Sequence, residues 1–166
     1  MVERSYIDTR YQPSLEDLKR HLRITSGDLD ETLQPYLLAA INVAEHQIGR
    51  VIAVSEMTDK RRFEHAVTLQ GPVLKMISVK VDDEEIEEAA WSLEGRNLQV
   101  SEQVAGKRME IVYEAGMSQV PFDIKAAILL MATKYFNNPS DSVEQLPSAA
   151  KNLLRPYRTW GIDNGE

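Results

Sequence analysis

The chain of 166 residues contains no cysteine. This absence excludes disulfide bonds, thiolate metal ligands and a cysteine nucleophile, and it fits a reducing compartment. No run approaches the roughly 18 apolar residues that a membrane span needs. The first ten residues, MVERSYIDTR, also lack the apolar segment of a secretory signal. We therefore expect a soluble globular protein with no membrane partner.

Positive charge is scarce as well. The chain has 19 lysine and arginine residues against 26 aspartate and glutamate residues, which gives a net charge of -7. Binding to nucleic acid depends on cationic side chains that release counterions from the phosphates, so an acidic chain is poorly suited to it. The short basic groups Lys60-Arg61-Arg62 and Lys107-Arg108 have carboxylates close by, and solvated surface is the preferred interpretation over phosphate contact.

The known motifs of catalysis and cofactor binding are missing too. The sequence has no G-x-G-x-x-G, G-x-S-x-G or H-E-x-x-H motif and no calcium loop. The nearest approach to a phosphate-binding loop, Gly106-Lys107, lacks two of the defining residues. His21, His46 and His65 are isolated from one another in the sequence and are better explained as surface or capped core residues than as metal ligands. The sequence predicts no catalytic residue, no metal and no cofactor.

What the chain does contain is helical periodicity at both ends. In the N-terminal part, Ser14 and Asp17 have the spacing of a capping box. An amphipathic segment then runs through residues 29–48, and a glycine follows it as a natural stop. Because proline removes a backbone hydrogen bond, Pro35 predicts either a kink or a helix that begins near Gln34.

Helical periodicity returns at Pro121, which suits the first position of a helix. The following segment AAILLMA, residues 126–132, is apolar on every side and is expected to be enclosed by other elements. Pro147 opens a short last helix. We expect Ile128 and Met131 to lie at the centre of an apolar core that the N-terminal and C-terminal helices share.

Between the helices the period of the pattern changes from about 3.6 to 2 residues. Residues 63–69, 74–81, 98–100 and 109–113 predict the strands of a small antiparallel sheet. The acidic segment DDEEIEE, residues 82–88, is interpreted as a solvated turn or loop. Acid-base catalysis needs two carboxyl groups in environments that separate their pKa values, and a solvated loop does not provide them.

The expected fold class is α+β, mainly α, with a bundle of about four helices and an inserted small antiparallel β-module. The length fits a single domain over residues 1–166. The expected parts are N-terminal helices at 14–50, a β-insert at 55–116, C-terminal helices at 120–158 and a flexible tail at 159–166.

Two aromatic residues, Tyr157 and Trp160, stand in the polar segment that follows Pro156. They either fold back on the domain or anchor a partner. The second interpretation is preferred, because exposed aromatic residues are commonly binding anchors.

Four segments occur in a characteristic order along the chain. They are LEDLKRHLRI at 15–24, the alanine-rich helix that ends in Ile48-Gly49-Arg50, Val120-Pro121 with DIKAAILL at 123–130, and LLRPYR at 153–158. In this order they resemble the head-tail connector, or adaptor, proteins of long-tailed bacteriophages and prophages. That family is also described as possible DNA-packaging proteins.

The resemblance implies a virion structural protein and not an enzyme. It implies that about a dozen copies form a ring beneath the portal vertex. The partners would be the portal protein on one side and a downstream stopper or tail-completion protein on the other. DNA would pass through the ring without specific binding during packaging and ejection. The protein would be found in the host bacterial cytoplasm during assembly and then at the head-tail junction of the virion.

Two sets of residues are predicted to serve these contacts. The C-terminal segment is locally basic and aromatic, and it is predicted to reach the portal. Its predicted partner-binding residues are Arg155, Tyr157, Arg158 and Trp160. The acidic segment is predicted to line the lumen of the ring, where it would repel DNA phosphates. Its predicted lumen-lining residues are Asp82, Asp83, Glu84 and Glu85.

Two other classes of protein stay open at this point. One is a small intracellular α+β ligand-binding protein or enzyme of unknown substrate. The other is a non-viral interaction module that uses the edge of its β-sheet. Genome neighbours that encode a portal, a protease and a major capsid protein would separate the connector from both.

Overall fold

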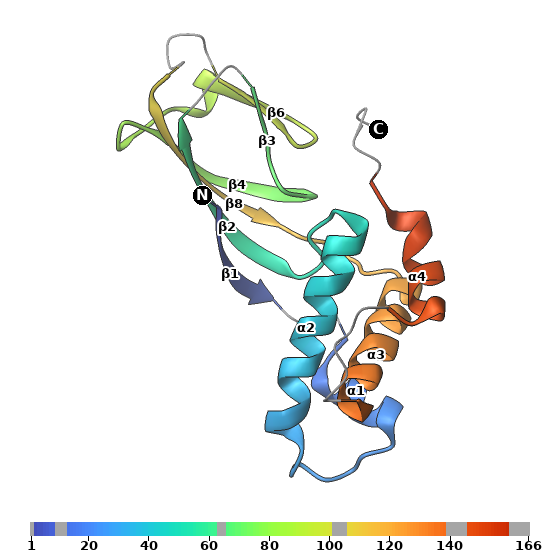
Figure 1. The fold of residues 1–166 in the computed structure, drawn as a ribbon. Helices are drawn as coiled ribbons and strands as arrows, with labels where there is room; N and C mark the ends of the chain where they lie inside the picture. The colour runs from blue at the N-terminus through green and yellow to red at the C-terminus, as the bar shows by residue number, and fades with distance from the viewer. Residues whose placement is uncertain (1, 9–12, 63–65, 101–105, 139–145, 160–166) are drawn as a thin grey trace. The chain divides into compact units, whose positions relative to one another are not determined.

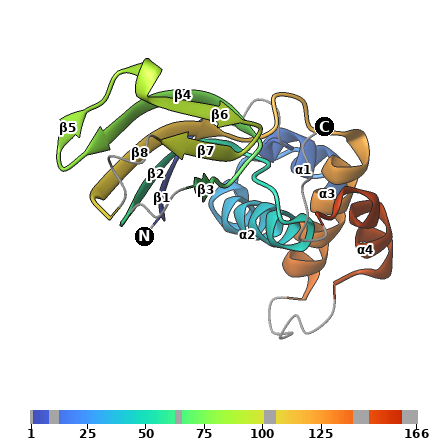
Figure 2. The same ribbon diagram turned by 90° about the horizontal axis from the view of Figure 1, so that it is seen from above.

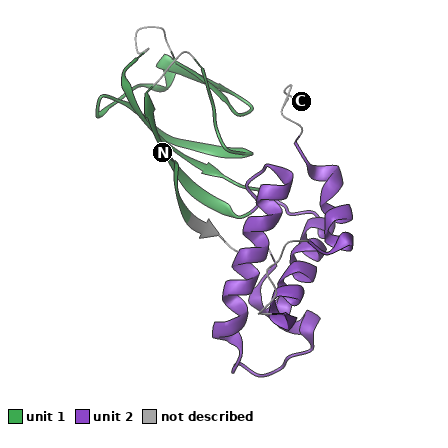
Figure 3. Ribbon diagram, in the orientation of Figure 1, with its two compact units in different colours: residues 1–8, 53–118, 162–166 green, residues 9–52, 119–161 purple. Residues whose placement is uncertain are grey.

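The computed structural model describes residues 2–8, 13–62, 66–100, 106–138 and 146–159. The chain divides into two compact units (Figure 3). The β-unit comprises Met1–Asp8, Ala53–Ser118 and Ile162–Glu166, and the helical unit comprises Thr9–Ile52 and Gln119–Gly161. That residues 1–166 fold as a single domain stays a prediction.

Four α-helices make up the described part of the helical unit (Figure 1). They are α1 (Leu15–Leu22), α2 (Asp30–Ile48), α3 (Phe122–Asn137) and α4 (Ser148–Leu154), and a 3-10 turn, η3 (Arg155–Tyr157), follows α4. Helix α3 packs against α1, α2 and α4, and α1 also contacts α2. The predicted number of helices is confirmed.

Helix α1 begins with the predicted capping box. The Ser14 hydroxyl accepts a hydrogen bond from the Asp17 backbone N–H at 3.1 Å, and the Asp17 carboxylate accepts one from the Ser14 backbone N–H at 3.0 Å. These two bonds satisfy backbone donors that have no partner within the helix. Helix α2 ends at Gly49, whose φ of 70° lies in the left-handed region that glycine adopts without strain.

Helix α2 begins at Asp30 and contains Pro35. The predicted alternative start near Gln34 is therefore wrong. The first turns are held by packing, because the Leu33 and Leu37 side chains are buried. Burial of an apolar face stabilises a helix more than local propensity does, and here it outweighs the loss of one backbone hydrogen bond.

The core of the helical unit includes Ile128 and Met131, which are fully buried as predicted. Helix α3 is not enclosed on all sides, however. Phe122 and Ala126 are exposed and Leu129 is half-buried. Their spacing places these three residues on one face of the helix. The prediction that the apolar segment is enclosed all round is wrong for that face.

Two antiparallel sheets form the described part of the β-unit (Figure 2). The five-stranded sheet has the order β1-β2-β8-β4-β5, with β1 at Val2–Asp8, β2 at Val54–Arg62, β8 at Arg108–Ala115, β4 at Val73–Val81 and β5 at Glu84–Glu85. The three-stranded sheet has the order β3-β7-β6, with β3 at Ala66–Thr68, β7 at Asn97–Val100 and β6 at Trp91–Glu94, and a 3-10 turn, η1 (Glu88–Ala90), precedes β6.

The β-unit is larger than the predicted insert. Strands β1, β2, β5 and β6 were not predicted, because the predicted strand at 63–69 corresponds to β3 among the described residues and β2 precedes it. The fold class α+β is confirmed, but helix and strand are roughly balanced, so the description "mainly α" is too strong. The core of this unit is well marked on β8, where Met109, Ile111 and Tyr113 alternate with less buried residues.

Candidate interaction surfaces

No cluster in the described ranges suits a metal ion, if three or more histidine, aspartate or glutamate side chains are required. Helices long and apolar enough for a membrane span are also absent from these ranges. His21 and His46 are exposed on α1 and α2, and His65 lies outside the described residues.

The C-terminal segment folds back on the helical unit. The Tyr157 hydroxyl donates a hydrogen bond to the Asp123 carboxylate at 3.2 Å. The Arg158 guanidinium donates to the Gln47 carbonyl at 3.0 Å and to the Gln47 side-chain oxygen at 3.1 Å. Burial and the negative charge of Asp123 raise the pKa of the Tyr157 hydroxyl further above neutral pH, which agrees with its role as a hydrogen-bond donor.

Thr159 extends this attachment by one residue. Its backbone N–H and its hydroxyl both donate to the Ile48 carbonyl, at 2.9 Å and 3.0 Å. The end of α2 leaves room for this contact because residue 49 is glycine: a Cβ there would lie 2.5 Å from the Thr159 hydroxyl oxygen. Of the predicted partner-binding residues, the structure thus holds Tyr157 and Arg158 against the helices and exposes Arg155, whereas Trp160 lies outside the described residues.

The acidic segment forms a hairpin between β4 and β5. Asp82 and Asp83 both have positive φ, 50° and 70°, and they form the two-residue turn between the paired residues Val81 and Glu84. Such turns favour aspartate, asparagine and glycine because these residues tolerate the left-handed region. The predicted turn is confirmed at Asp82 and Asp83, and Glu84 and Glu85 continue as the short strand β5.

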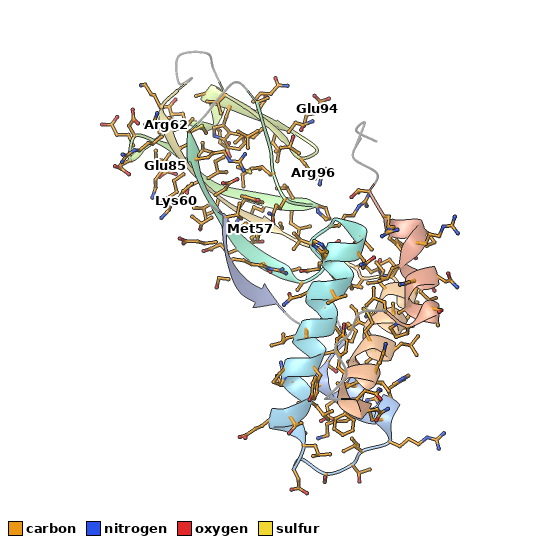
Figure 4. The ribbon with its side chains drawn as sticks, viewed as in Figure 1. Met57, Lys60, Arg62, Glu85, Glu94 and Arg96 are labelled. Carbon is orange, nitrogen blue, oxygen red and sulfur yellow. The ribbon has the colours of Figure 1, made fainter. Side chains whose placement is uncertain are left out.

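The four predicted lumen-lining carboxylates are exposed and gathered on this hairpin. Asp82 also has a local role, since its carboxylate accepts from the Arg108 backbone N–H at 3.1 Å and its own N–H donates to the Arg108 carbonyl at 2.9 Å. Basic residues stand nearby: Arg62 pairs in register with Arg108, and Figure 4 shows Arg62 at the same end of the β-unit as Glu85. The hairpin therefore carries a cluster of negative charges, and the positively charged side chains of arginine residues lie near it.

A groove lies between α1 and α3 within the helical unit. Its volume is about 580 Å³, and its lining residues are Pro13, Asp17, Arg20, His21, Phe122, Lys125, Ala126 and Leu129. The apolar part comes mainly from α3, whereas charged side chains come from both helices. Hydrogen bonds from Ser14 and the nearby Arg20 charge lower the pKa of Asp17, so the groove contains a carboxylate stabilised in its charged form. Sequence reasoning missed this surface because it expected the apolar segment of α3 to be enclosed.

The edge of the five-stranded sheet carries a second apolar surface. Strand β4 has irregularities in its register with β8 between Val73 and Lys75 and again between Met76 and Ser78. The residues inside these irregularities, Leu74 and Ile77, are 41% and 43% exposed. The sequence of this strand does not indicate which of its apolar side chains face solvent.

No protein-family model matches the chain, and no curated protein matches it. Solved structures with the same fold include chains from gene transfer agent particles. A chain in the neck of the empty particle, computed with C6 symmetry, has a TM-score of 0.76 and 20% identity. A chain in the neck of the native particle, computed with C12 symmetry, has a TM-score of 0.74 and 20% identity. A chain in the virion of the native particle has a TM-score of 0.73 and 21% identity. Each match covers 98% of both chains, so this protein has the fold of these particle chains over essentially its whole length.

Proposed function

We propose that this chain is a structural subunit of the neck of a phage-like particle, where copies form a ring between the portal vertex and the tail. The observation that carries the proposal is the full-length fold match to chains from necks of gene transfer agent particles. The ordered segments at both ends of the chain, which resemble head-tail connectors, support it independently. DNA would pass through this ring during packaging and ejection.

The surfaces of the chain suit such an assembly. A ring forms when one patch of a subunit binds a different patch of the next subunit and the rotation closes. The chain has two unlike apolar surfaces, the groove between α1 and α3 in the helical unit and the edge of β4 in the β-unit. Chains with the same fold occur in necks that were computed with C6 and C12 symmetry, and cyclic symmetry fits a closed ring of copies. The fold match gives no support to the two alternatives that the sequence left open, a small ligand-binding protein or enzyme and a non-viral module that interacts through its sheet edge.

The C-terminal segment is proposed to contact the portal. Arg155 and Arg158 are both exposed, but Arg158 is hydrogen-bonded to Gln47, and Trp160 follows the attached residues Tyr157 to Thr159 in the sequence. Deleting everything after Leu154 would also remove the bonds to Asp123, Gln47 and Ile48, so point substitutions separate binding from folding better. Arg155→Glu and Trp160→Ala should abolish joining to portal-bearing heads, and exposed Lys151→Glu on α4 serves as the control.

The acidic hairpin is proposed to line the lumen. The test variant removes all four charges by the substitutions Asp82→Asn, Asp83→Asn, Glu84→Gln and Glu85→Gln. Asparagine retains both the preference for this turn and the acceptor for the Arg108 N–H. Ring assembly should persist while the kinetics of DNA ejection change, because repulsion of phosphates by the hairpin is lost. Unchanged ejection kinetics would count against this lining.

Electron microscopy tests the central proposal. The purified chain is imaged alone and after addition to heads that carry a portal, because a portal can stabilise a ring that the free subunit does not populate. Rings in solution, or ring density at the portal vertex, are expected. A chain that forms no ring in either setting would contradict the proposal.

A further inference from the structure

Large apolar side chains are exposed at three places in the described chain. They are Leu74 at 41%, Ile77 at 43% and Phe122 at 88%. Leu74 and Ile77 lie on β4 in the β-unit, and Phe122 begins α3 in the helical unit. Exposed apolar residues that cluster mark interaction sites more often than scattered ones do.

The exposure of Leu74 and Ile77 results from two bulges in one strand. In the ladder between β4 and β8, Val73 pairs with Ala115, and Lys75 pairs with Glu114, so Leu74 has no partner. The next irregularity leaves Ile77 out in the same way. A bulge turns the side chain of its extra residue away from the regular alternation. Both bulges of β4 therefore expose an aliphatic side chain, with Lys75 between the two.

The exposed part of β4 is poorly suited to pairing with a further strand through backbone hydrogen bonds. Strand β5 pairs only with Lys80 and Val81, so the rest of β4 has β8 as its one described neighbour. Two bulges and an exposed lysine are features that block the addition of a further strand. A partner must therefore engage the side chains. We call Leu74, Lys75 and Ile77 the bulged edge.

Phe122, in contrast to the two aliphatic side chains of the bulged edge, is a single large aromatic ring that projects from the start of helix α3. Ala126 lies one turn further on the same face and is exposed as well, so the small side chain there leaves most of the ring accessible. The exposed carboxylate of Asp123 follows it directly and accepts the hydrogen bond from Tyr157. We call Phe122 and Asp123 the aromatic knob.

We propose that the aromatic knob of one copy of this chain docks on the bulged edge of a second copy, with Phe122 against Leu74 and Ile77 and Asp123 beside Lys75. The inference rests on the proposed ring, and it names the surfaces that build it. Three observations indicate a second copy as the occupant. The two patches are unlike and occur on the same chain, Asp123 and Lys75 have opposite charges, and chains with this fold occur in necks that were computed with cyclic symmetry.

Complementation by two defective copies tests this contact. Phe122→Ser removes the knob and leaves the bulged edge, whereas the double variant Leu74→Ser with Ile77→Ser removes the edge and leaves the knob. All three positions are exposed, so these substitutions should leave folding intact, and circular dichroism of each variant checks this. Each variant alone should form no ring by electron microscopy. Mixed in equal amounts, they should form heterodimers that stop at two copies, which sedimentation velocity detects.

Charge reversal provides a second readout. Lys75→Asp and Asp123→Lys should each weaken assembly by about tenfold, and the two changes in one chain should restore it, because the pair is re-formed with opposite polarity. Asp123→Lys also removes the acceptor for the Tyr157 hydroxyl, and Tyr157→Phe, which loses the same hydrogen bond without a change of charge, measures that separate effect. Lys107→Asp, at another exposed lysine of the β-unit, is the matched control and should leave assembly unchanged. Failure of the double reversal to restore assembly would overturn the pairing of Lys75 with Asp123.

The outcomes separate this contact from the function on which it rests. Wild-type rings that persist in both surface variants would overturn the docking of the knob on the bulged edge and leave the neck function standing. Absence of wild-type rings, both in solution and on portal-bearing heads, would overturn the neck function and this contact together. Assembly lost in each variant, with heterodimers in the mixture, supports both.

Discussion

Glu45 is a buried carboxylate that closes the C-terminal end of α2. Its side chain is 9% exposed, and its Oε1 accepts a hydrogen bond from the Ile52 backbone N–H at 2.7 Å. Its backbone carbonyl accepts from the N–H groups of Gly49 and Arg50. One residue thus supplies acceptors for three backbone donors where the chain leaves the helix.

Replacing Glu45 tests this role. Glu45→Ala leaves the buried Ile52 N–H without its acceptor and should lower the free energy of unfolding by roughly 1 to 3 kcal/mol. Glu45→Gln retains an oxygen acceptor and should cost clearly less. Urea denaturation followed by circular dichroism measures both values. Equal losses of unfolding free energy in the two variants would show that Glu45 stabilises the fold through its charge rather than through the hydrogen bond to Ile52.

At the scale of elements, the start of α1 and the end of α2 are marked by strong local sequence signals, whereas the sequence of β2 lacks the alternation of a strand. The inward-facing residues of β2 include Ser55 and Asp59, which are 0% and 1% exposed. Ser55 is satisfied by the Ala53 carbonyl and by Arg4 of β1, and Asp59 pairs with Arg61. Because polar residues occupy inward positions, the apolar alternation that predicts a strand is missing from this part of the sequence.

The capping box of α1 leads to a prediction that depends on pH. Ser14→Ala removes the hydroxyl that accepts from the Asp17 N–H and donates to its carboxylate, and it should cost about 1 kcal/mol at pH 7. The Asp17 pKa is lowered in the folded chain, so the associated stability is present above the ordinary aspartate pKa of about 3.9 and is lost as the pH falls through the lowered value.

The loss caused by Ser14→Ala should therefore be larger at pH 7 than near pH 3. Chemical denaturation at several pH values measures this difference, and Ser14→Thr, which retains a hydroxyl, is the control. A loss that grows as the pH falls would contradict the assignment of the lowered pKa to this capping box.

At the scale of the whole molecule, the chain passes between the two units several times. Segments of each unit are separated in sequence by segments of the other, so neither unit is a continuous piece of chain. A single domain predicts that both units unfold in one cooperative transition. This prediction can be examined because Trp91 lies in the β-unit, whereas all four described α-helices lie in the helical unit.

In a Trp160→Phe background, fluorescence reports on Trp91 and far-ultraviolet circular dichroism reports chiefly on the helices. The two denaturation curves should coincide. Ile128→Ala creates a cavity in the helical unit and should shift both curves together, by about 2 to 5 kcal/mol. A shift of the dichroism curve alone would show that the units unfold independently.

The sequence by itself determined the features that depend on neighbouring residues. The capping box at Ser14, the glycine stop after α2 and the turn at Asp82 are local, because each requires only a few residues with particular backbone preferences or hydrogen-bonding groups. The α+β class and the four helices follow from the periodicity of longer segments. The acidic hairpin could be located in the same way, although its place in an assembly could not.

Only the tertiary structure decided which residues form surfaces. The exposure of Leu74, Ile77 and Phe122 depends on which elements cover them, and their sequence neighbourhoods are as apolar as those of buried residues. The attachment of Tyr157 and Arg158 joins residues 34 and 111 positions apart, which no local pattern encodes. Burial and long-range hydrogen bonds are properties of the packed chain, and for this reason the candidate surfaces emerged from the fold.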